Sequence, residues 1–137
     1  MIDVPKGIAL WLHLSGVVLL IGGAMYGRMA AKAAARILPE ESAVKFSDAA
    51  AKRYRVWIWI ALVLLVITGI LNYLDTGAHS VLYHVLLGVK LLLVAHVFSS
   101  ALLATRPENP RRPRQLLGAG ISGFLVILIA VYMSQIA

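Results

Sequence analysis

The sequence is poor in several kinds of residue. It has no cysteine, which excludes thiolate metal sites, iron–sulfur clusters and disulfide bonds. It has only six acidic residues, and none lies in the middle of a long apolar segment, which argues against a small proton-coupled drug exporter. Charged residues of both signs make up 14% of the 137 residues, against about 25% in typical globular proteins.

Apolar residues are in large excess, at 61% of the chain. A water-soluble chain of this length cannot bury so much apolar surface. The apolar residues fall into four segments, each close to the roughly 20 residues that a helix needs to cross a bilayer. These segments are residues 7–26, 56–73, 80–104 and 116–133. We therefore predict an all-α, polytopic membrane protein in which residues 1–137 form one bundle of four transmembrane helices.

The connections between these segments contain helix-breaking residues. Pro39 interrupts an Ala-rich stretch between the first two segments, and Ser80 can cap the third helix. Residues 106–114 are Pro-rich, and we expect them to be non-helical.

The basic residues are distributed unevenly along the chain. Eleven of the thirteen lie in or beside the first and third connections: Arg28, Lys32, Arg36, Lys45, Lys52, Arg53, Arg55, Arg106, Arg111, Arg112 and Arg114. By the positive-inside rule these connections face the cytoplasm, while both termini and residues 75–80 face the opposite side of the inner (cytoplasmic) membrane. The net charge of +7 thus indicates topology and contact with the headgroups of the lipid bilayer, and no nucleic acid partner.

Four ionisable side chains lie inside the apolar segments: His13, His84, Lys90 and His96. At ~1.5 Å per residue, His13 and His84 lie about 9 Å and 6 Å from the same membrane surface, on two different helices. Two imidazoles at one level are what a bis-histidine haem requires. We predict these two residues as axial ligands, and the alternative is that both are packing residues with hydrogen bonds to neighbouring helices.

Small residues accompany both histidines. Gly16 and Gly88 lie about one turn deeper on the same helix faces and could leave room for a flat macrocycle, or they could simply allow helices to pack closely. His96 lies ~18 Å deeper than His84 and cannot share its iron. It is either a ligand of a second metal group or a buried polar residue. His79, in the turn, is either solvated or an alternative ligand.

Lys90 lies near the middle of the membrane without an acidic partner in any segment. It is predicted to bind a carboxylate such as a porphyrin propionate, assisted by Arg28, or to act catalytically in redox-linked proton transfer. A neutral lysine bonded to helix carbonyls is the alternative. Thr68 and Asn72 could orient a ligating imidazole or hydrogen-bond across helices.

Three short motifs resemble the HemJ-type protoporphyrinogen oxidases and the related CopD-like membrane domains. They are His13 with Gly23 and Arg28, the Lys-Leu-Leu-Leu-Val of residues 90–94, and the Ile-Thr-Gly of residues 67–69. The resemblance implies four membrane helices that bind haem b and oxidise a porphyrin, with His13 and Lys90 as functional residues. The CopD-like relation implies copper uptake instead.

Three functions follow as hypotheses. The first is a membrane protein that binds haem b and performs electron transfer or redox chemistry on a porphyrin or quinone, whether or not it is an enzyme. The second is copper handling, with imidazole and thioether ligands from His13, His79, His84 and Met133. The third is a structural subunit whose small-residue faces pair in a homodimer or with another membrane protein.

Overall fold

The structure is a computed structural model, described for residues 3–75 and 77–136. Over these residues it has four α-helices: α1 (Val4–Ile37), α2 (Glu40–Asp75), α3 (Val81–Ala104) and α4 (Arg112–Ile136). Each is long and apolar enough to cross a membrane. The prediction of an all-helical chain with four such segments is therefore confirmed.

The helix ends follow from local sequence. The side chain of Asp3 accepts a hydrogen bond from the backbone N–H of Lys6 at 3.1 Å and caps α1, while Leu38 leaves the helical conformation directly before Pro39. The α2 helix begins at Glu40, where an acidic side chain stabilises the positive end of a helix. The prediction that Ser80 caps the third helix is confirmed, because its hydroxyl accepts from the backbone N–H of Tyr83 at 3.1 Å.

The prediction for residues 106–114 is wrong at its end. The α4 helix begins at Arg112, so residues 112–114 are helical. Pro113 fits there because backbone N–H groups in the first turn of a helix have no partner within the helix, so the N–H that proline lacks is not needed. Proline content alone could not separate a loop from a proline in a first helical turn.

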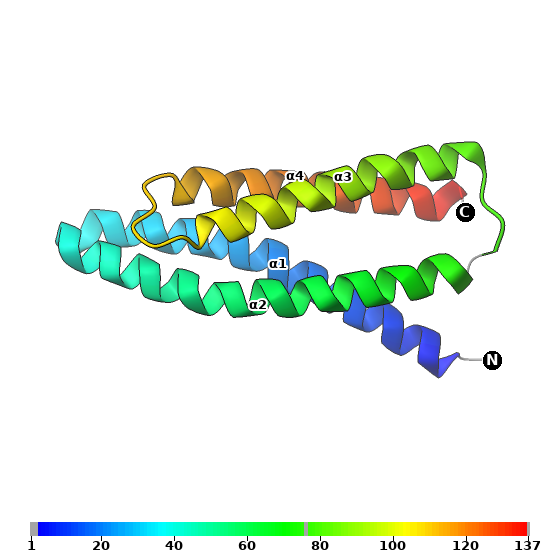
Figure 1. Ribbon diagram of the computed structural model, residues 1–137, viewed down its shortest axis with the longest axis horizontal. Helices are drawn as coiled ribbons and strands as arrows, with labels where there is room; N and C mark the ends of the chain where they lie inside the picture. Colours follow the sequence, from blue (N-terminus) through cyan, green and yellow to red (C-terminus); the bar gives the residue numbers. More distant parts are fainter. Residues whose placement is uncertain (1–2, 76, 137) are drawn as a thin grey trace.

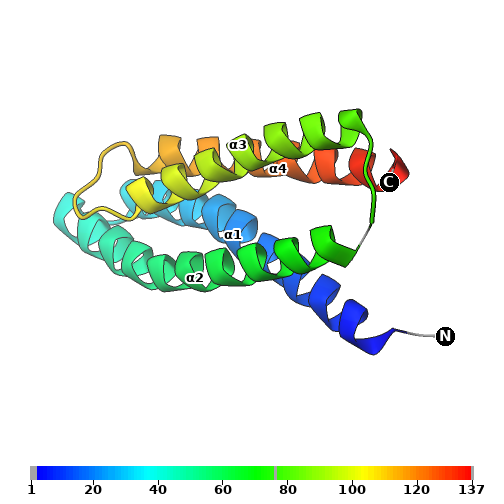
Figure 2. The same ribbon diagram turned by 45° about the vertical axis from the view of Figure 1, so that its right-hand side comes forward.

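The helices run up and down, so that both termini and the α2–α3 connection lie at one end of the bundle (Figure 1). We call this the terminal end. The α1–α2 and α3–α4 connections lie at the other end, which we call the basic end because the basic residues of both connections gather there. Figure 2 shows from a second side that α3 and α4 run alongside each other while α1 crosses α2 obliquely.

Packing is uneven along the bundle. The α1 helix packs on α2 and α4, and α3 packs on α4, whereas α2 and α3 have few contacts with each other. Small residues bring the four helices together in the core, notably Ala24, Ala61, Ala101 and Ala119, with Ile58 among them. Toward the terminal end α2 diverges from α3 (Figures 1 and 2).

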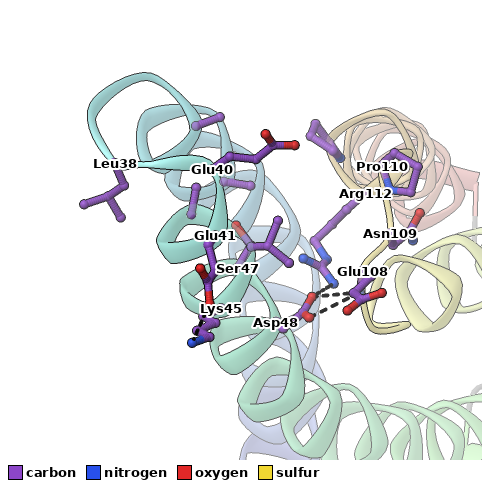
Figure 3. A pocket seen from close by; sticks show the side chains of 15 residues that line it. Leu38, Glu40, Glu41, Lys45, Ser47, Asp48, Glu108, Asn109, Pro110 and Arg112 are labelled. Carbon is purple, nitrogen blue, oxygen red and sulfur yellow. Dashed lines mark hydrogen bonds and ion pairs between the residues drawn. The ribbon is translucent and has the colours of Figure 1, made fainter.

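An ion pair fastens the basic end. Buried Arg112 donates to the carboxylate of Asp48 at 2.8 Å, to the carbonyl of Ala104 at 2.7 Å and to that of Arg106 at 2.7 Å. The Asp48 carboxylate also accepts from the backbone N–H of Glu108 at 3.1 Å (Figure 3). We call this set of contacts the Asp48–Arg112 latch. It joins α2 to the α3–α4 connection.

Candidate functional site

The candidate site is a cavity of about 430 Å³ that all four helices line. This volume lies within the roughly 300–1,000 Å³ typical of small-molecule sites. Most of the lining is aliphatic, aromatic or glycine. The polar side chains are His13 from α1, Asn72 and Tyr73 from α2, and Tyr83 and Lys90 from α3. The site can therefore hold a largely apolar ligand with a few polar groups.

His13 is held in a defined orientation. Its Nδ1 lies 2.7 Å from the hydroxyl oxygen of Thr68, and that hydroxyl donates its one proton to the carbonyl of Leu64 at 2.5 Å. Thr68 must therefore accept, and the imidazole must donate from Nδ1. The lone pair is then on Nε2. Ligating histidines commonly have this arrangement, with the distal ring nitrogen held by a hydrogen bond.

The position of His13 depends on a glycine of α2. A Cβ atom at Gly69 would lie 3.8 Å from Cε1 of His13, so the ring packs directly over this glycine. Thr68 is almost fully buried and holds the ring from the same helix. The Thr-Gly pair of residues 68 and 69 thus forms the seat of the imidazole. The sequence predicts Thr68 as a partner of a ligating imidazole, but it indicates no such role for Gly69.

Lys90 lines the same cavity as His13 and is partly buried. It is the one charged side chain among the described lining residues, and within residues 3–75 and 77–136 no carboxylate forms an ion pair with it. An ammonium group in an apolar cavity is most stable beside an anion. The cavity therefore favours a ligand that brings a carboxylate or another acidic group.

His84 lies outside this cavity. Its Nδ1 donates to the carbonyl of Ser80 at 2.9 Å, so its Nε2 accepts from the hydroxyl of Tyr73 at 3.2 Å. Both ring nitrogens are engaged, and the side chain is exposed. His84 belongs to a group of rings at the terminal end in which His79 stacks on Tyr83 with centroids 3.9 Å apart. The sequence predicts that His13 and His84 lie at the same depth in the membrane, but only His13 lines the cavity.

His96 lies at the other end of α3 from His84. Its Nδ1 is 2.8 Å from the hydroxyl of Ser122 on α4, and its Nε2 is 3.3 Å from that of Ser100. Across the described part of the chain, no group of three or more histidine, aspartate or glutamate side chains is placed to hold a metal ion. His96 joins α3 to α4 through the hydrogen bond to Ser122, and its role as a metal ligand stays a prediction.

The remaining predicted site residues, Gly16, Gly88 and Arg28, do not line the cavity of His13. Leu65 fills the space beside Gly16, where a Cβ would come within 3.1 Å of it, so Gly16 serves helix packing. Gly88 has open space beside it. Arg28 is partly buried toward the basic end, does not line the cavity, and its Nε is buried without a hydrogen-bond partner in the described structure.

Two features of the cavity lining carried only weak sequence signals. Met133 from α4 is buried against the cavity and places a thioether in the same lining as His13. The sequence indicated it only as a candidate thioether ligand for copper. Gly123, also on α4, lines the cavity and lets Ile21 of α1 pack closely against α4, because a Cβ at this position would lie 2.6 Å from the Ile21 side chain. A glycine among many in apolar segments gave no indication of this role.

A second, larger cavity of about 970 Å³ lies at the basic end, beside the Asp48–Arg112 latch (Figure 3). Its lining combines the acidic residues Glu40 and Glu41 with Lys45 and small apolar side chains. Lys45 is paired with Glu41 at 3.1 Å, and both are exposed. This cavity contains none of the residues predicted for the site.

Comparisons with known proteins add no relative. No family model, no curated protein and no solved structure matches this chain.

Proposed function

We propose that the chain is a multi-pass protein of the inner membrane with its basic end in the cytoplasm. The support is the distribution of charge: the terminal end has Lys6 as the one basic residue near it, while eleven arginines and lysines lie toward the other end. Both basic connections lie at the same end of the bundle, as the positive-inside rule requires (Figure 1). The two termini and residues 75–80 are then on the non-cytoplasmic side.

Within this arrangement we propose that the cavity of His13 and Lys90 binds haem b or a closely related porphyrin. The observation that carries the proposal is one apolar cavity that holds both an imidazole with its Nε2 lone pair available and an ammonium group without a counter-ion. Haem has the matching groups, namely an iron that accepts imidazole, an apolar ring and carboxylate side chains. The donor set therefore fits this cofactor.

Each residue then has a defined part. His13 would hold the iron through Nε2, and Thr68 fixes the tautomer and the direction of the ring. Lys90 would bind a propionate. Met133 also lines the cavity, and a methionine sulfur can ligate haem iron, so the proposal uses it in place of His84. A bound haem would supply one-electron redox chemistry, and electron transfer or oxidation of a porphyrin or quinone is the activity that we propose.

The resemblance to the HemJ-type oxidases supports the same two residues, because it points independently to His13 and Lys90. Copper handling is less well supported. A copper(II) site takes several imidazole or similar ligands, and no cluster of three such side chains exists among the described residues. Its candidate ligands lie in two pairs: His13 and Met133 line the cavity, and the rings of His79 and His84 lie 5.9 Å apart at the terminal end.

The visible spectrum of the purified protein tests the proposal. We expect Soret and α bands that sharpen on reduction with dithionite, and a haem-to-protein ratio near one. A colourless protein that contains stoichiometric copper would contradict it and support the CopD-like alternative. A colourless protein that stays colourless when haem is added during reconstitution would contradict both redox proposals and leave a structural subunit.

A further inference from the structure

A groove of about 440 Å³ lies between α3 and α4 toward the basic end of the bundle, separate from the cavity of His13. It is lined by His96 and Ser100 of α3, by Arg114, Gln115 and Gly118 of α4, and by Arg111 just before α4. Every side chain in this set except that of glycine can donate a hydrogen bond. A groove with so many donors favours an anion.

The two arginines of the groove lack acidic partners. Arg112 turns inward into the Asp48–Arg112 latch, whereas Arg111 and Arg114 are exposed and form no ion pair within the described residues. The other donors are oriented by neighbours. The oxygen of Gln115 accepts from Asn109 at 2.7 Å, which leaves its NH₂ group to donate. His96 is held between Ser122 and Ser100, so both of its ring nitrogens are engaged within the protein, and Arg111, Arg114 and Gln115 are the side chains with donors for an anion. The groove thus presents an organised set of donors with excess positive charge.

The depth of the groove matches the boundary of a membrane. Ser100 and His96 lie four and eight residues before the end of α3, which places them about 6 Å and 12 Å inside the helix end. Arg111 and Arg114 lie at the helix end itself. The groove therefore runs from the headgroup layer into the upper part of the hydrocarbon layer.

Exposed apolar residues continue the groove toward the membrane centre. Leu92 lies one turn from His96 on α3, and Leu125 lies two turns from Gly118 on α4, so both are on the faces that line the groove. Leu92 and Leu125 are exposed, at 75% and 45%. A ligand with a phosphate at the arginines and an acyl chain along these leucines would match the polarity of the surface at each depth.

We propose that this groove is a binding site for an anionic phospholipid of the cytoplasmic leaflet, with the lipid phosphate bound by Arg111 and Arg114. Guanidinium groups bind phosphate through paired, charge-assisted hydrogen bonds, and Gln115 adds a neutral donor. The proposal requires that the helices span the membrane with the basic end in the cytoplasm, and it does not depend on haem.

The test is the thermal stability of the purified protein in a neutral detergent, titrated with short-chain phosphatidylglycerol, short-chain phosphatidylcholine or inorganic phosphate. We expect Tm to rise in a saturable way with phosphatidylglycerol, and not with phosphatidylcholine or inorganic phosphate. The variant Arg111→Gln/Arg114→Gln should weaken this binding by roughly 5-fold for each arginine, or about 25-fold in total. Arg53→Gln/Arg55→Gln is the matched control, because it removes the same charge from exposed positions on α2.

Two results would overturn the proposal. Equal weakening in both double variants would reduce the effect to general attraction between a basic protein and acidic lipid. An equal rise in Tm with inorganic phosphate would assign the groove to a free anion instead of a lipid. The substituted side chains are exposed, so we expect both double variants to fold like the unmodified protein. Native mass spectrometry of these three proteins counts the lipids that each retains and checks the Tm result independently.

Discussion

His13 is the residue on which the proposed function depends most. Its presence inside an apolar segment was enough to predict importance, because ionisable groups in a membrane are costly. Its partner was harder to predict. Rise along a helix gives depth, but the direction of a side chain depends on how the helices cross, and here α1 crosses α2 toward Thr68 and Gly69 while His84 faces Tyr73. The sequence could therefore place both imidazoles at one depth without showing that His13 lines the cavity and His84 does not.

Thr68 offers a test of how His13 is held. The substitution Thr68→Val keeps the shape of the side chain and removes the oxygen that accepts from Nδ1. We expect the affinity of the haem-free protein for haem to fall by about 10- to 100-fold, as is typical when the partner of a ligating histidine is lost. Ser122→Ala is the control, because it removes the hydroxyl bonded to His96 outside the cavity. Equal losses in the two variants would argue against a special role for Thr68.

Lys90 can be tested through the charge of the ligand. The haem-free protein should bind haem more tightly than haem dimethyl ester, because the ester lacks the propionate charge that Lys90 would bind. Charge-assisted hydrogen bonds contribute about 1.5–3 kcal/mol, so the preference should be roughly 10- to 100-fold. It should disappear in Lys90→Met and persist in Lys52→Met, an exposed lysine outside the cavity. A preference that survives in Lys90→Met would assign the propionate to another residue.

At the scale of the helices, composition was a strong guide. Runs of apolar residues predicted all four, and Pro39 and Ser80 marked two of the boundaries correctly. The sequence did not reveal how the ends are joined. Asp48 is one of only six acidic residues, and nothing in its local sequence indicates an ion pair with Arg112, 64 residues away. Long-range contacts of this kind depend on the folded arrangement of α2 against the α3–α4 connection.

The Asp48–Arg112 latch should contribute strongly to stability. In Asp48→Ala, the guanidinium of Arg112 stays buried without its counter-charge, which typically costs about 3 kcal/mol in the free energy of unfolding. Glu41→Ala breaks an exposed ion pair with Lys45 and should change stability by less than about 0.5 kcal/mol. Unfolding in detergent, followed by circular dichroism, measures both. Similar small losses in the two variants would show that the latch is energetically unimportant.

At the scale of the whole molecule, the uneven packing explains where a ligand could bind. Small residues hold the helices together in the core, and the few contacts between α2 and α3 leave room for the cavity. The sequence predicts the bundle but not this divergence. The facing surfaces of α2 and α3 are mostly apolar, and no periodicity in them separates a cavity wall from a lipid-facing surface.

Orientation in the membrane can be measured directly, and the lack of native cysteine makes the experiment simple. Single cysteines at the exposed positions Ala78 and Glu41 lie at the terminal end and the basic end, respectively. A membrane-impermeant maleimide should label Ala78→Cys from outside the inner membrane, and should label Glu41→Cys only after the membrane is permeabilised. The reverse pattern would contradict the proposed topology.

The haem-to-protein ratio of two histidine variants, reconstituted with haem under identical conditions, tests the central claim most directly. The account predicts that His13→Ala loses bound haem, whereas His84→Ala keeps a ratio and a reduced spectrum close to those of the unmodified protein. Retention of haem in His13→Ala together with its loss in His84→Ala would contradict the assignment of the cavity as the cofactor site.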